Sequence, residues 1–201
     1  MEVLEAIRSR RAVKHFDPNH VITKEERRIL LESALQAPTS FNIQHWRVVE
    51  VSEEKLREQI YAAAWNQAQV KEASLLFVIC ADLKAYAKEP ARYWQNAPSE
   101  VQEMLVPMIE PFYDSNERLQ RDEAMRSVGI FAQTLMLAAK GLGYDSCPMI
   151  GFDAESVAKC IQLPDDHAIG MMLTVGKALK PAWPKPGQLP LEDIFIENMF
   201  S

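Results

Sequence analysis

The sequence has few cysteines and histidines, and their spacing excludes two kinds of site. Among its 201 residues are 3 cysteines, Cys80, Cys147 and Cys160. Their number is odd and no two form a Cys-x-x-Cys pair, so the sequence predicts neither a disulfide framework nor a cysteine zinc site. The 4 histidines lack the spacing of motifs such as His-Glu-x-x-His. We therefore expect no metal centre.

Long apolar runs and glycine-rich loops are also missing. No stretch of about 18 apolar residues occurs, so we expect no membrane-spanning helix. The first residues, MEVLEAIRSRR, are charged from position 2 onward and lack the apolar centre of a signal peptide, which favours a cytoplasmic protein. With 7 glycines, the sequence contains neither Gly-x-Gly-x-x-Gly nor a P-loop motif, so it predicts no nucleotide site of either type.

The chain is acidic, yet one short segment is strongly basic. A net charge of -6 and a pI near 5.3 argue against a nucleic-acid partner or an anionic membrane surface. Against this background, the segment RSRRAVKHFD at 8–17 holds four cations and ends beside Phe16, which we expect to pack the segment onto the body. Arg10 and Lys14 fall on the same alternation of an extended chain, so they can converge on one small anion. The alternative is a solvated basic helix end.

Apolar periodicity predicts an α+β protein with long helices and few strands. Thr23 and Glu26 form a capping-box pattern before the second helix, which Pro38 ends. Ser52 is the expected cap of the third helix, and 144–153 is expected to be a loop. The expected helices cover 3–11, 24–37, 52–65, 123–143 and 154–164, and the expected strands cover 46–52, 75–81 and 168–178.

Two segments lack a clear strand pattern. Residues 84–122 are rich in Lys, Glu, Pro, Tyr and Trp and predict a helical excursion over the surface. The tail from 178 has four prolines before its last apolar segment, so it cannot form one regular element and is expected to follow a surface or a partner subunit. We treat residues 1–201 as one domain.

Two further segments have the composition of binding loops. The polar loop APTSFNIQHW at 37–46 connects a helix to a strand and offers hydroxyl and amide groups. The segment CPMIGFD at 147–153 offers backbone N–H groups, and Gly151 permits close approach of a ligand. The alternatives are an ordinary connection and a plain turn.

These segments, in this order, resemble the FMN-dependent nitroreductase family. The resemblance covers nearly the whole chain, and its specificity comes from the ordered set of short motifs. They are RRAVKHF (10–16), PTSFNIQHW (38–46), GLG (141–143), PMIGF (148–152), VG (175–176) and PLED (190–193).

The resemblance implies a flavin site shared between two subunits. It places Arg10 near the ribityl phosphate, Lys14 near the pyrimidine end of the ring and Asn66 at the isoalloxazine edge. It assigns the polar loop to the other subunit and the 148–151 turn to the flavin. The implied cofactor-binding residues are Arg10, Arg11, Ala12, Lys14, Pro38, Thr39, Ser40, Asn42, Gln44, Asn66, Gln69, Pro148, Met149, Ile150, Gly151, Lys185 and Gln188.

The implied fold is a nitroreductase-like fold in a domain-swapped homodimer. It has a small central mixed or antiparallel sheet flanked by helices, and residues 178–201 wrap the partner. The implied activity is an FMN-dependent NAD(P)H oxidoreductase that reduces nitroaromatics, quinones or related acceptors by ping-pong hydride transfer through flavin N5, without a catalytic side chain. Residues 84–122 would cover the active site. The alternatives are another flavin reaction, such as reductive dehalogenation, dehydrogenation or flavin fragmentation, and a redox-silent flavin-binding dimer.

The chain departs from the family pattern at four places. Ala12 replaces a Ser or Thr, Gln69 stands where many members have a cation, and His45 replaces a Pro. Residues 186–188 replace a Lys-x-Arg pair, with Lys185 as the candidate substitute.

Three other residues receive a structural interpretation. Trp65 is assigned to packing, Asp82 to a cap or the surface, and His167 to a loop.

Overall fold

Four strands form one antiparallel sheet within residues 1–200, the part of the chain that this computed structural model describes. They are β1 (Trp46–Glu50), β2 (Leu75–Asp82), β3 (Asp145–Met149) and β4 (His167–Gly176), in the spatial order β1-β2-β4-β3. All three ladders between neighbouring strands are antiparallel. The α+β class is thus confirmed, and the antiparallel alternative for the sheet holds.

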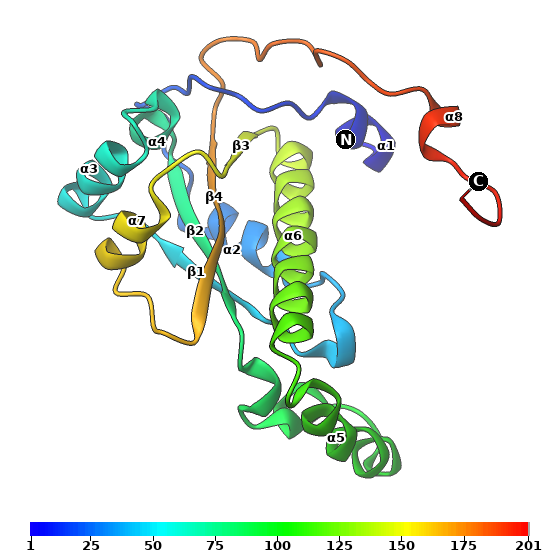
Figure 1. The fold of residues 1–201 in the computed structure, drawn as a ribbon. Coiled ribbons are helices and arrows are strands. Elements are labelled where there is room, and N and C mark those ends of the chain that lie inside the picture. The colour runs from blue at the N-terminus through cyan, green and yellow to red at the C-terminus, as the bar shows by residue number, and fades with distance from the viewer. Residues whose placement is uncertain (201) are drawn as a thin grey trace.

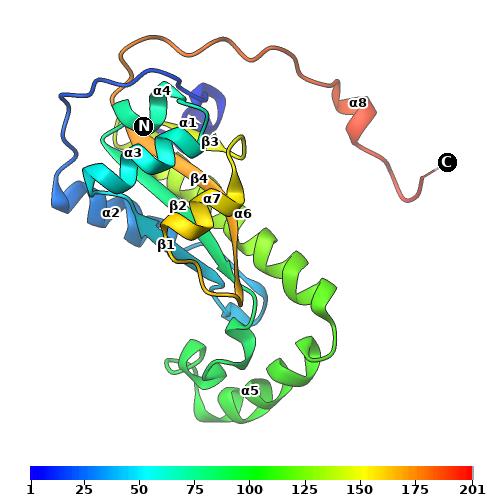
Figure 2. The ribbon, with the colours of Figure 1, turned by 60° about the vertical axis from the view of Figure 1, so that its left-hand side comes forward.

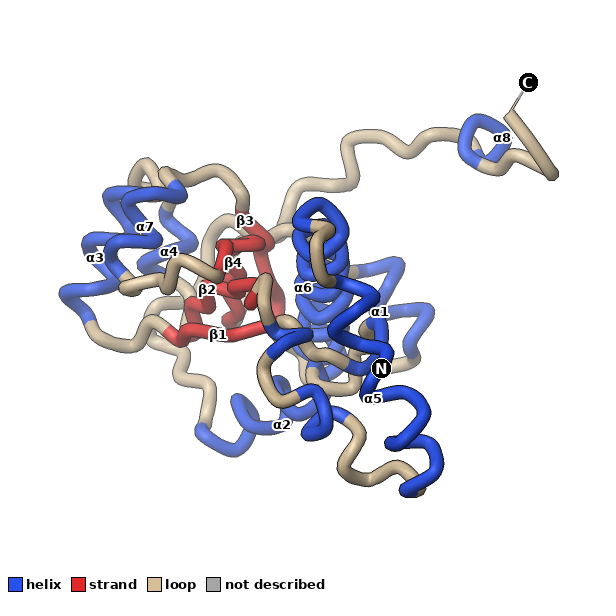
Figure 3. Tube along the Cα trace, turned by 60° about the horizontal axis from the view of Figure 1, so that its bottom comes forward, coloured by secondary structure: helices blue, strands red, loops and turns tan. Residues whose placement is uncertain are grey.

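Helices cover both faces of this sheet. One layer contains α6, against which α1 and α2 pack, and the other contains α3, α4 and α7 (Figure 3). Within residues 1–200, no helix combines the length and apolar character needed to cross a membrane. The helices are α1 (Val3–Ser9), α2 (Lys24–Ala34), α3 (Glu54–Ala63), α4 (Ala68–Glu72), α5 (Ser99–Tyr113), α6 (Glu117–Gly141), α7 (Ala154–Cys160) and α8 (Leu191–Ile194), with short 3-10 turns η1 (Ser40–Asn42), η2 (Ala85–Ala87) and η3 (Pro90–Tyr93).

The buried strand β2 divides the core into two clusters. Because successive side chains of a strand point to opposite faces, Phe77 and Ile79 pack toward α6, whereas Leu76 and Val78 pack toward α3, α4 and α7. All eight residues of β2 are buried, as its continuous apolar run predicts. Helix α6 contributes Phe131 to the first cluster and lies along the sheet (Figure 1).

Side-chain caps set the starts of α2, α3, α6 and α7. The predicted capping box of α2 is present: Thr23 accepts a hydrogen bond from the Glu26 backbone, and the Glu26 carboxylate accepts one from the Thr23 backbone. The expected Ser52 cap is wrong, because the side chain of Glu53 accepts the hydrogen bonds at the start of α3. Helix α6 begins at Glu117, earlier than expected, because Asn116 caps it.

The prediction of a loop over 144–153 is wrong for its first half, which forms β3. Pro148 lies within this strand and conceals it in the sequence, because proline cannot donate a ladder hydrogen bond. The sheet order makes β3 an edge strand, where proline is tolerated. The loop prediction holds beyond Met149.

The excursion is helical, as expected, and has a small core of its own. Ile43 packs there with Tyr86, Ile109 and Tyr113, so η2 and α5 are tied to the polar loop before β1. This part of the chain projects from one end of the sheet. The tail leaves the opposite end as an extended segment that leads to α8 (Figure 2).

Candidate functional site

The basic segment lies alongside β3. Ala12 forms a bridge with Ser146, and the Val13 N–H donates to the Ser146 carbonyl over 3.1 Å. Phe16 is fully buried, which confirms that it anchors the segment. This arrangement brings the Lys14 ammonium to 3.3 Å from the Cys147 sulfur.

The cations of this segment are left without carboxylate partners. Within residues 1–200, neither Arg10, Arg11 nor Lys14 forms an ion pair, whereas eight arginines and lysines elsewhere do. Arg11 instead donates to the carbonyls of Arg8 and Arg10. In an acidic protein, such uncompensated charge favours an anionic ligand.

Cys147 accepts a hydrogen bond from Lys14 but does not neutralise the charge of the Lys14 ammonium. Burial raises the pKa of the Cys147 thiol, and the nearby Lys14 and Arg10 cations only partly oppose this effect. The thiol is therefore neutral at physiological pH and accepts a hydrogen bond from the Lys14 ammonium. Arg10 and Lys14 thus both lie near enough to Cys147 to lower the pKa of its thiol, and their convergence on one anion stays a prediction.

A second wall comes from the segment between α3 and α4. The Gln69 amide donates to Gln67 over 2.9 Å and approaches the Met149 sulfur to 3.7 Å. Gln67 also donates to the Gly151 carbonyl over 2.7 Å. These contacts join Gln67 and Gln69 to β3 and to the turn after it, and the flavin contacts of Asn66 and Gln69 stay predictions.

A side chain at position 151 would crowd this second wall, which explains the glycine there. A Cβ atom at Gly151 would lie 3.3 Å from the Trp65 ring, which is tighter than ordinary contact. Trp65 is itself 66% exposed, so it lies outside the core of its own chain, and its assignment to packing stays a prediction. Trp65 and Asn66 both adopt positive φ, 56° each, which turns the chain sharply and directs Trp65 outward.

These walls fit a flat, amphipathic anion. Ile150 is 82% exposed and precedes Gly151, which lies against the Trp65 ring, so this wall also offers apolar surface. Lys14 also lines an open cavity of about 540 Å³ together with Ala12, His15, Lys180 and Trp183. Uncompensated cations, side-chain amides and exposed apolar groups are the kinds of group that a flavin mononucleotide needs around it.

The polar loop lies elsewhere in the same chain. The Ser40 N–H donates to Glu123 of α6 over 3.3 Å, and the Asn42 amide donates to the Tyr93 carbonyl over 2.8 Å. Glu123 and Gly141, at the end of α6 that leads to β3, are about 27 Å apart along the helix. One chain therefore does not bring this loop to the cations near Cys147.

The loop is held in a defined shape. The Gln44 N–H donates to the Thr39 hydroxyl, and the Gln44 amide donates to the Asn42 carbonyl. Phe41, Asn42 and Gln44 all have positive φ, which costs conformational free energy in residues other than glycine. The hydrogen bonds within the loop and the packing beneath it offset this cost. Pro38, just after α2, and Asn42 are exposed, so the loop presents polar groups outward.

His45, which replaces a proline of the family motif, is buried beneath the loop. Its Nδ1 lies 3.1 Å from the Ser127 hydroxyl, which itself donates to the Glu123 carbonyl. Since the hydroxyl has one hydrogen, His45 Nδ1–H is the donor. Burial lowers the pKa of His45 to about 4, so the ring is neutral at physiological pH.

The tail residues that the resemblance implies lie outside this group. Lys185 and Gln188 contact each other, and neither lines the cavity at Lys14. The part of the tail that does line it, Lys180 and Trp183, received no role from the sequence.

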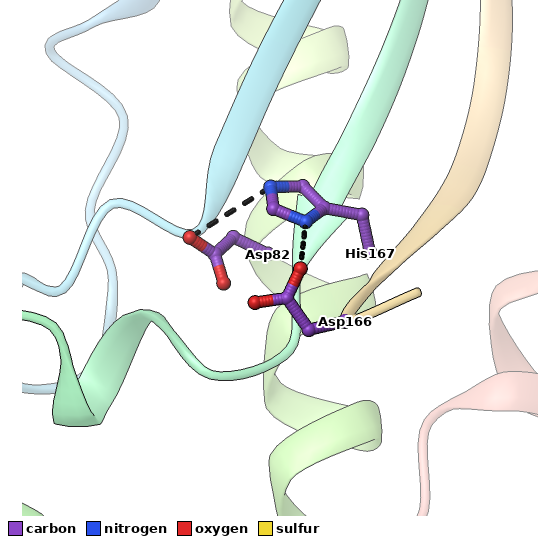
Figure 4. Close-up of side chains that lie close together, drawn as sticks. All are labelled: Asp82, Asp166 and His167. Carbon is purple, nitrogen blue, oxygen red and sulfur yellow. Dashed lines mark hydrogen bonds and ion pairs between the residues drawn. The ribbon is translucent and has the colours of Figure 1, made fainter. Parts of the chain in front are cut away.

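A charge network at the base of the excursion shows that Asp82 is buried rather than at the surface and that His167 starts a strand rather than lying in a loop. The Asp82 carboxylate also accepts a hydrogen bond from the Lys84 backbone N–H over 3.1 Å, as the alternative of a cap predicts. Asp82 is buried and ion-paired with Arg47 and Lys88, and His167 begins β4 and bonds Asp166 over 2.6 Å (Figure 4). The atoms of Asp82, Asp166 and His167 that could bind a metal lie within 4.8 Å of one another. The Lys88 ammonium, 2.9 Å from Asp82 and 2.6 Å from Asp166, already supplies their cation.

Sequence reasoning missed Cys147 and Gln67. Cys147 would follow from recognising β3, because alternation places 147 and 149 on one face of a strand. Gln67 has no sequence signal, since its role depends on contacts that only folding creates.

The fold and this gathering of residues define a class of protein. Residues 7–177 match the model of the Nitroreductase family. The chain belongs to this family.

Individual relatives span almost the whole chain. Protein DrgA of Synechocystis is 53% identical over 196 residues, covering 95% of this chain and 93% of DrgA. The candidate NAD(P)H nitroreductase YodC of Bacillus subtilis is 33% identical, covering 95% of this chain and 96% of its own. A candidate nitroreductase of Exiguobacterium sibiricum, solved in complex with FMN, is 29% identical with a TM-score of 0.91, covering 98% of this chain and 97% of its own.

Proposed function

We propose that this protein is an FMN-dependent oxidoreductase that accepts electrons from NADH or NADPH and passes them to nitroaromatics, quinones or related acceptors. The observation that carries the proposal is the pair of uncompensated cations, Arg10 and Lys14, beside Cys147 of β3, the strand that leads into the Met149–Gly151 turn. Family membership and the FMN complex of the Exiguobacterium relative support it.

Each wall of the site has a distinct task in this proposal. Arg10 binds the phosphate, with the neighbouring Arg11 and Ala12 forming the backbone of that segment. Lys14, held by a neutral thiol, keeps its full charge for the electron-rich end of the ring. Asn66 and Gln69 supply amides, and the Pro148–Gly151 turn supplies backbone N–H groups and an apolar surface. When bound, the flavin carries the hydride chemistry, and the chain binds, orients and tunes it.

A single open site serves both substrates in turn. Both substrates react with one flavin at the open cavity that Lys14 lines, so we expect donor and acceptor to exchange at the same place. Ping-pong kinetics follow from this arrangement. A proton can come from solvent, so no catalytic side chain is required.

The proposal includes a homodimer with two sites. The polar loop of Pro38, Thr39, Ser40, Asn42 and Gln44 is separated from the cations of its own chain, so it can meet a flavin only through a second copy. The tail also exposes Trp183 and Phe195, which are 89% and 68% exposed. Extended chain with large exposed apolar side chains favours a partner surface, and the placement of Lys185 and Gln188 against a phosphate depends on that assembly.

Anaerobic titration of the FMN-reconstituted protein tests the activity. NADH or NADPH is expected to bleach the flavin absorbance, and a nitroaromatic or quinone is expected to restore it. Bleaching that neither acceptor reverses would favour another flavin reaction on this fold. A protein that binds no FMN would contradict the proposal.

A charge variant tests the site itself. Lys14→Gln removes the cation beside Cys147, and we expect about tenfold weaker FMN binding, as for loss of one charge-assisted hydrogen bond. Binding is measured by fluorescence quenching of FMN. Lys24→Gln, an exposed cation at the start of α2, is the matched control and is expected to bind FMN as the wild type does.

A further inference from the structure

An open cavity of about 450 Å³ lies beside the polar loop, next to the edge strand β1. Its walls combine Gln44, Arg47, Arg92, Tyr93 and Gln95 with the side of Trp46. The lining holds two guanidinium groups and two amides and no carboxylate. In a chain with a net charge of -6, this composition selects for anions.

Arg47 forms the fixed part of this lining. It donates to the Gln44 carbonyl over 3.0 Å and to the buried carboxylate of Asp82 over 3.1 Å. Because Asp82 is only 2% exposed, it holds the guanidinium firmly and offsets its charge. Arg47 therefore shapes the cavity and supplies N–H donors rather than net charge.

Arg92 supplies the uncompensated charge. Its guanidinium donates to the Tyr93 hydroxyl over 2.9 Å and lies 4.9 Å from the centre of the Tyr93 ring. Tyr93 is fixed in turn, because its hydroxyl donates to the Ala85 carbonyl over 3.0 Å. No carboxylate of residues 1–200 forms an ion pair with Arg92. The cation is thus positioned before any ligand arrives.

We propose that this cavity binds the anionic group of a substrate, a phosphate or a carboxylate, with Arg92 as its principal ligand. An arginine fork matches both groups, and the amides of Gln44 and Gln95 add neutral donors. The inference rests on the proposed function, because Gln44 belongs to the loop that reaches the flavin of a second copy. It adds a substrate class to that function: a donor or acceptor that carries a negative charge.

Binding of inorganic pyrophosphate, measured by calorimetry on the purified protein, tests the anion site without any turnover. Arg92→Gln keeps a similar length and is expected to weaken binding about tenfold, the effect of one lost charge-assisted hydrogen bond. Arg118→Gln, on an exposed part of α6 away from the cavity, is the matched control and is expected to bind as the wild type does. Equal binding by the two variants, or none by the wild type, overturns the proposal.

Steady-state kinetics then identify the source of the anion. If the donor supplies it, Arg92→Gln raises the KM for NADH or NADPH. If the acceptor supplies it, the variant raises the KM for 4-nitrobenzoate and leaves that for 4-nitrobenzamide unchanged. Unchanged KM values for all four compounds overturn the assignment to a substrate. A wild-type protein whose flavin neither donor reduces would contradict the proposed function instead, and the pyrophosphate measurement would still decide the anion site.

Discussion

At the scale of single residues, two departures from the family motif have different consequences. They are Gln69, which stands in place of a cation, and His45, which stands in place of a proline. Gln69 is buried and bonds Gln67, so it has become part of the wall rather than a charged ligand. His45 is neutral and buried beneath the polar loop, where it donates to Ser127. The positive charge of the site therefore rests on the basic segment, and His45 adds a dependence of stability on pH.

His45 is expected to destabilise the protein at acidic pH. Its pKa is about 4 in the folded chain and near 6.5 when exposed, so the unfolded state binds more protons between these values. Stability is thus lost as pH falls from about 6.5 toward 4. The contribution between pH 7 and pH 5 is about 2 kcal/mol.

Urea unfolding at the two pH values measures this contribution. His45→Gln lacks the titrating group, so its free energy of unfolding is expected to fall by about 2 kcal/mol less than that of the wild type over this interval. The difference between the two proteins removes the effect of all other titrating groups. Parallel losses in wild type and variant would show that His45 does not titrate as described.

At the scale of elements, the contact between α6 and β4 sets the position of the whole site. Helix α6 separates the polar loop from the basic segment, and its far end leads directly into β3. A close approach at Gly170 makes this packing possible: a Cβ atom there would lie 2.4 Å from the Val128 Cγ1 atom and 3.4 Å from the Ile79 carbonyl. Gly170 also lies opposite the irregularity between Ile79 and Cys80.

Gly170→Ala is expected to lower the free energy of unfolding by about 1–3 kcal/mol, because the added methyl overpacks the contact with α6. Gly141→Ala is the matched control. It adds the same methyl at the exposed end of α6, where nothing lies within 4 Å, and is expected to be close to neutral. Thermal or urea unfolding measures both. A Gly170→Ala protein as stable as the control would mean that α6 shifts freely on the sheet.

At the scale of the whole molecule, the exposed tail and the divided site both point to assembly. Beyond Trp183, the tail as far as residue 200 leads away from the body to α8, where Leu191 is 70% exposed (Figure 2). Exposed apolar side chains on an extended segment favour contact with another surface.

The full chain is expected to behave as a dimer of about 46 kDa, twice the 22.9 kDa of one chain. A variant that ends at Trp183 keeps the residues that line the cavity at Lys14 but loses the rest of the exposed tail. We expect it to dissociate at concentrations where the full chain remains dimeric, and to bind FMN more weakly. Light scattering measures the mass, and circular dichroism checks that the variant is folded. A dimer of unchanged stability would exclude the tail from the interface.

The sequence by itself determined the α+β class, most helices, the buried strand β2 and the family, because apolar periodicity, capping residues and motif order are local properties of the chain. It also identified the basic segment, because a cluster of four cations in an acidic chain can be recognised from the sequence alone. The strand β3 escaped it because Pro148 gives the signal of a loop, and only pairing with β4 makes that segment a strand.

Only the tertiary structure decided which groups meet. The neutral thiol of Cys147 under Lys14, the outward Trp65 and the ion-paired Asp82 depend on contacts between segments far apart in the sequence. The separation of the polar loop from the basic segment has the same origin. Both segments were recognisable from their residues, but the length of α6, which keeps them apart within one chain, acts only once the helix is packed on the sheet.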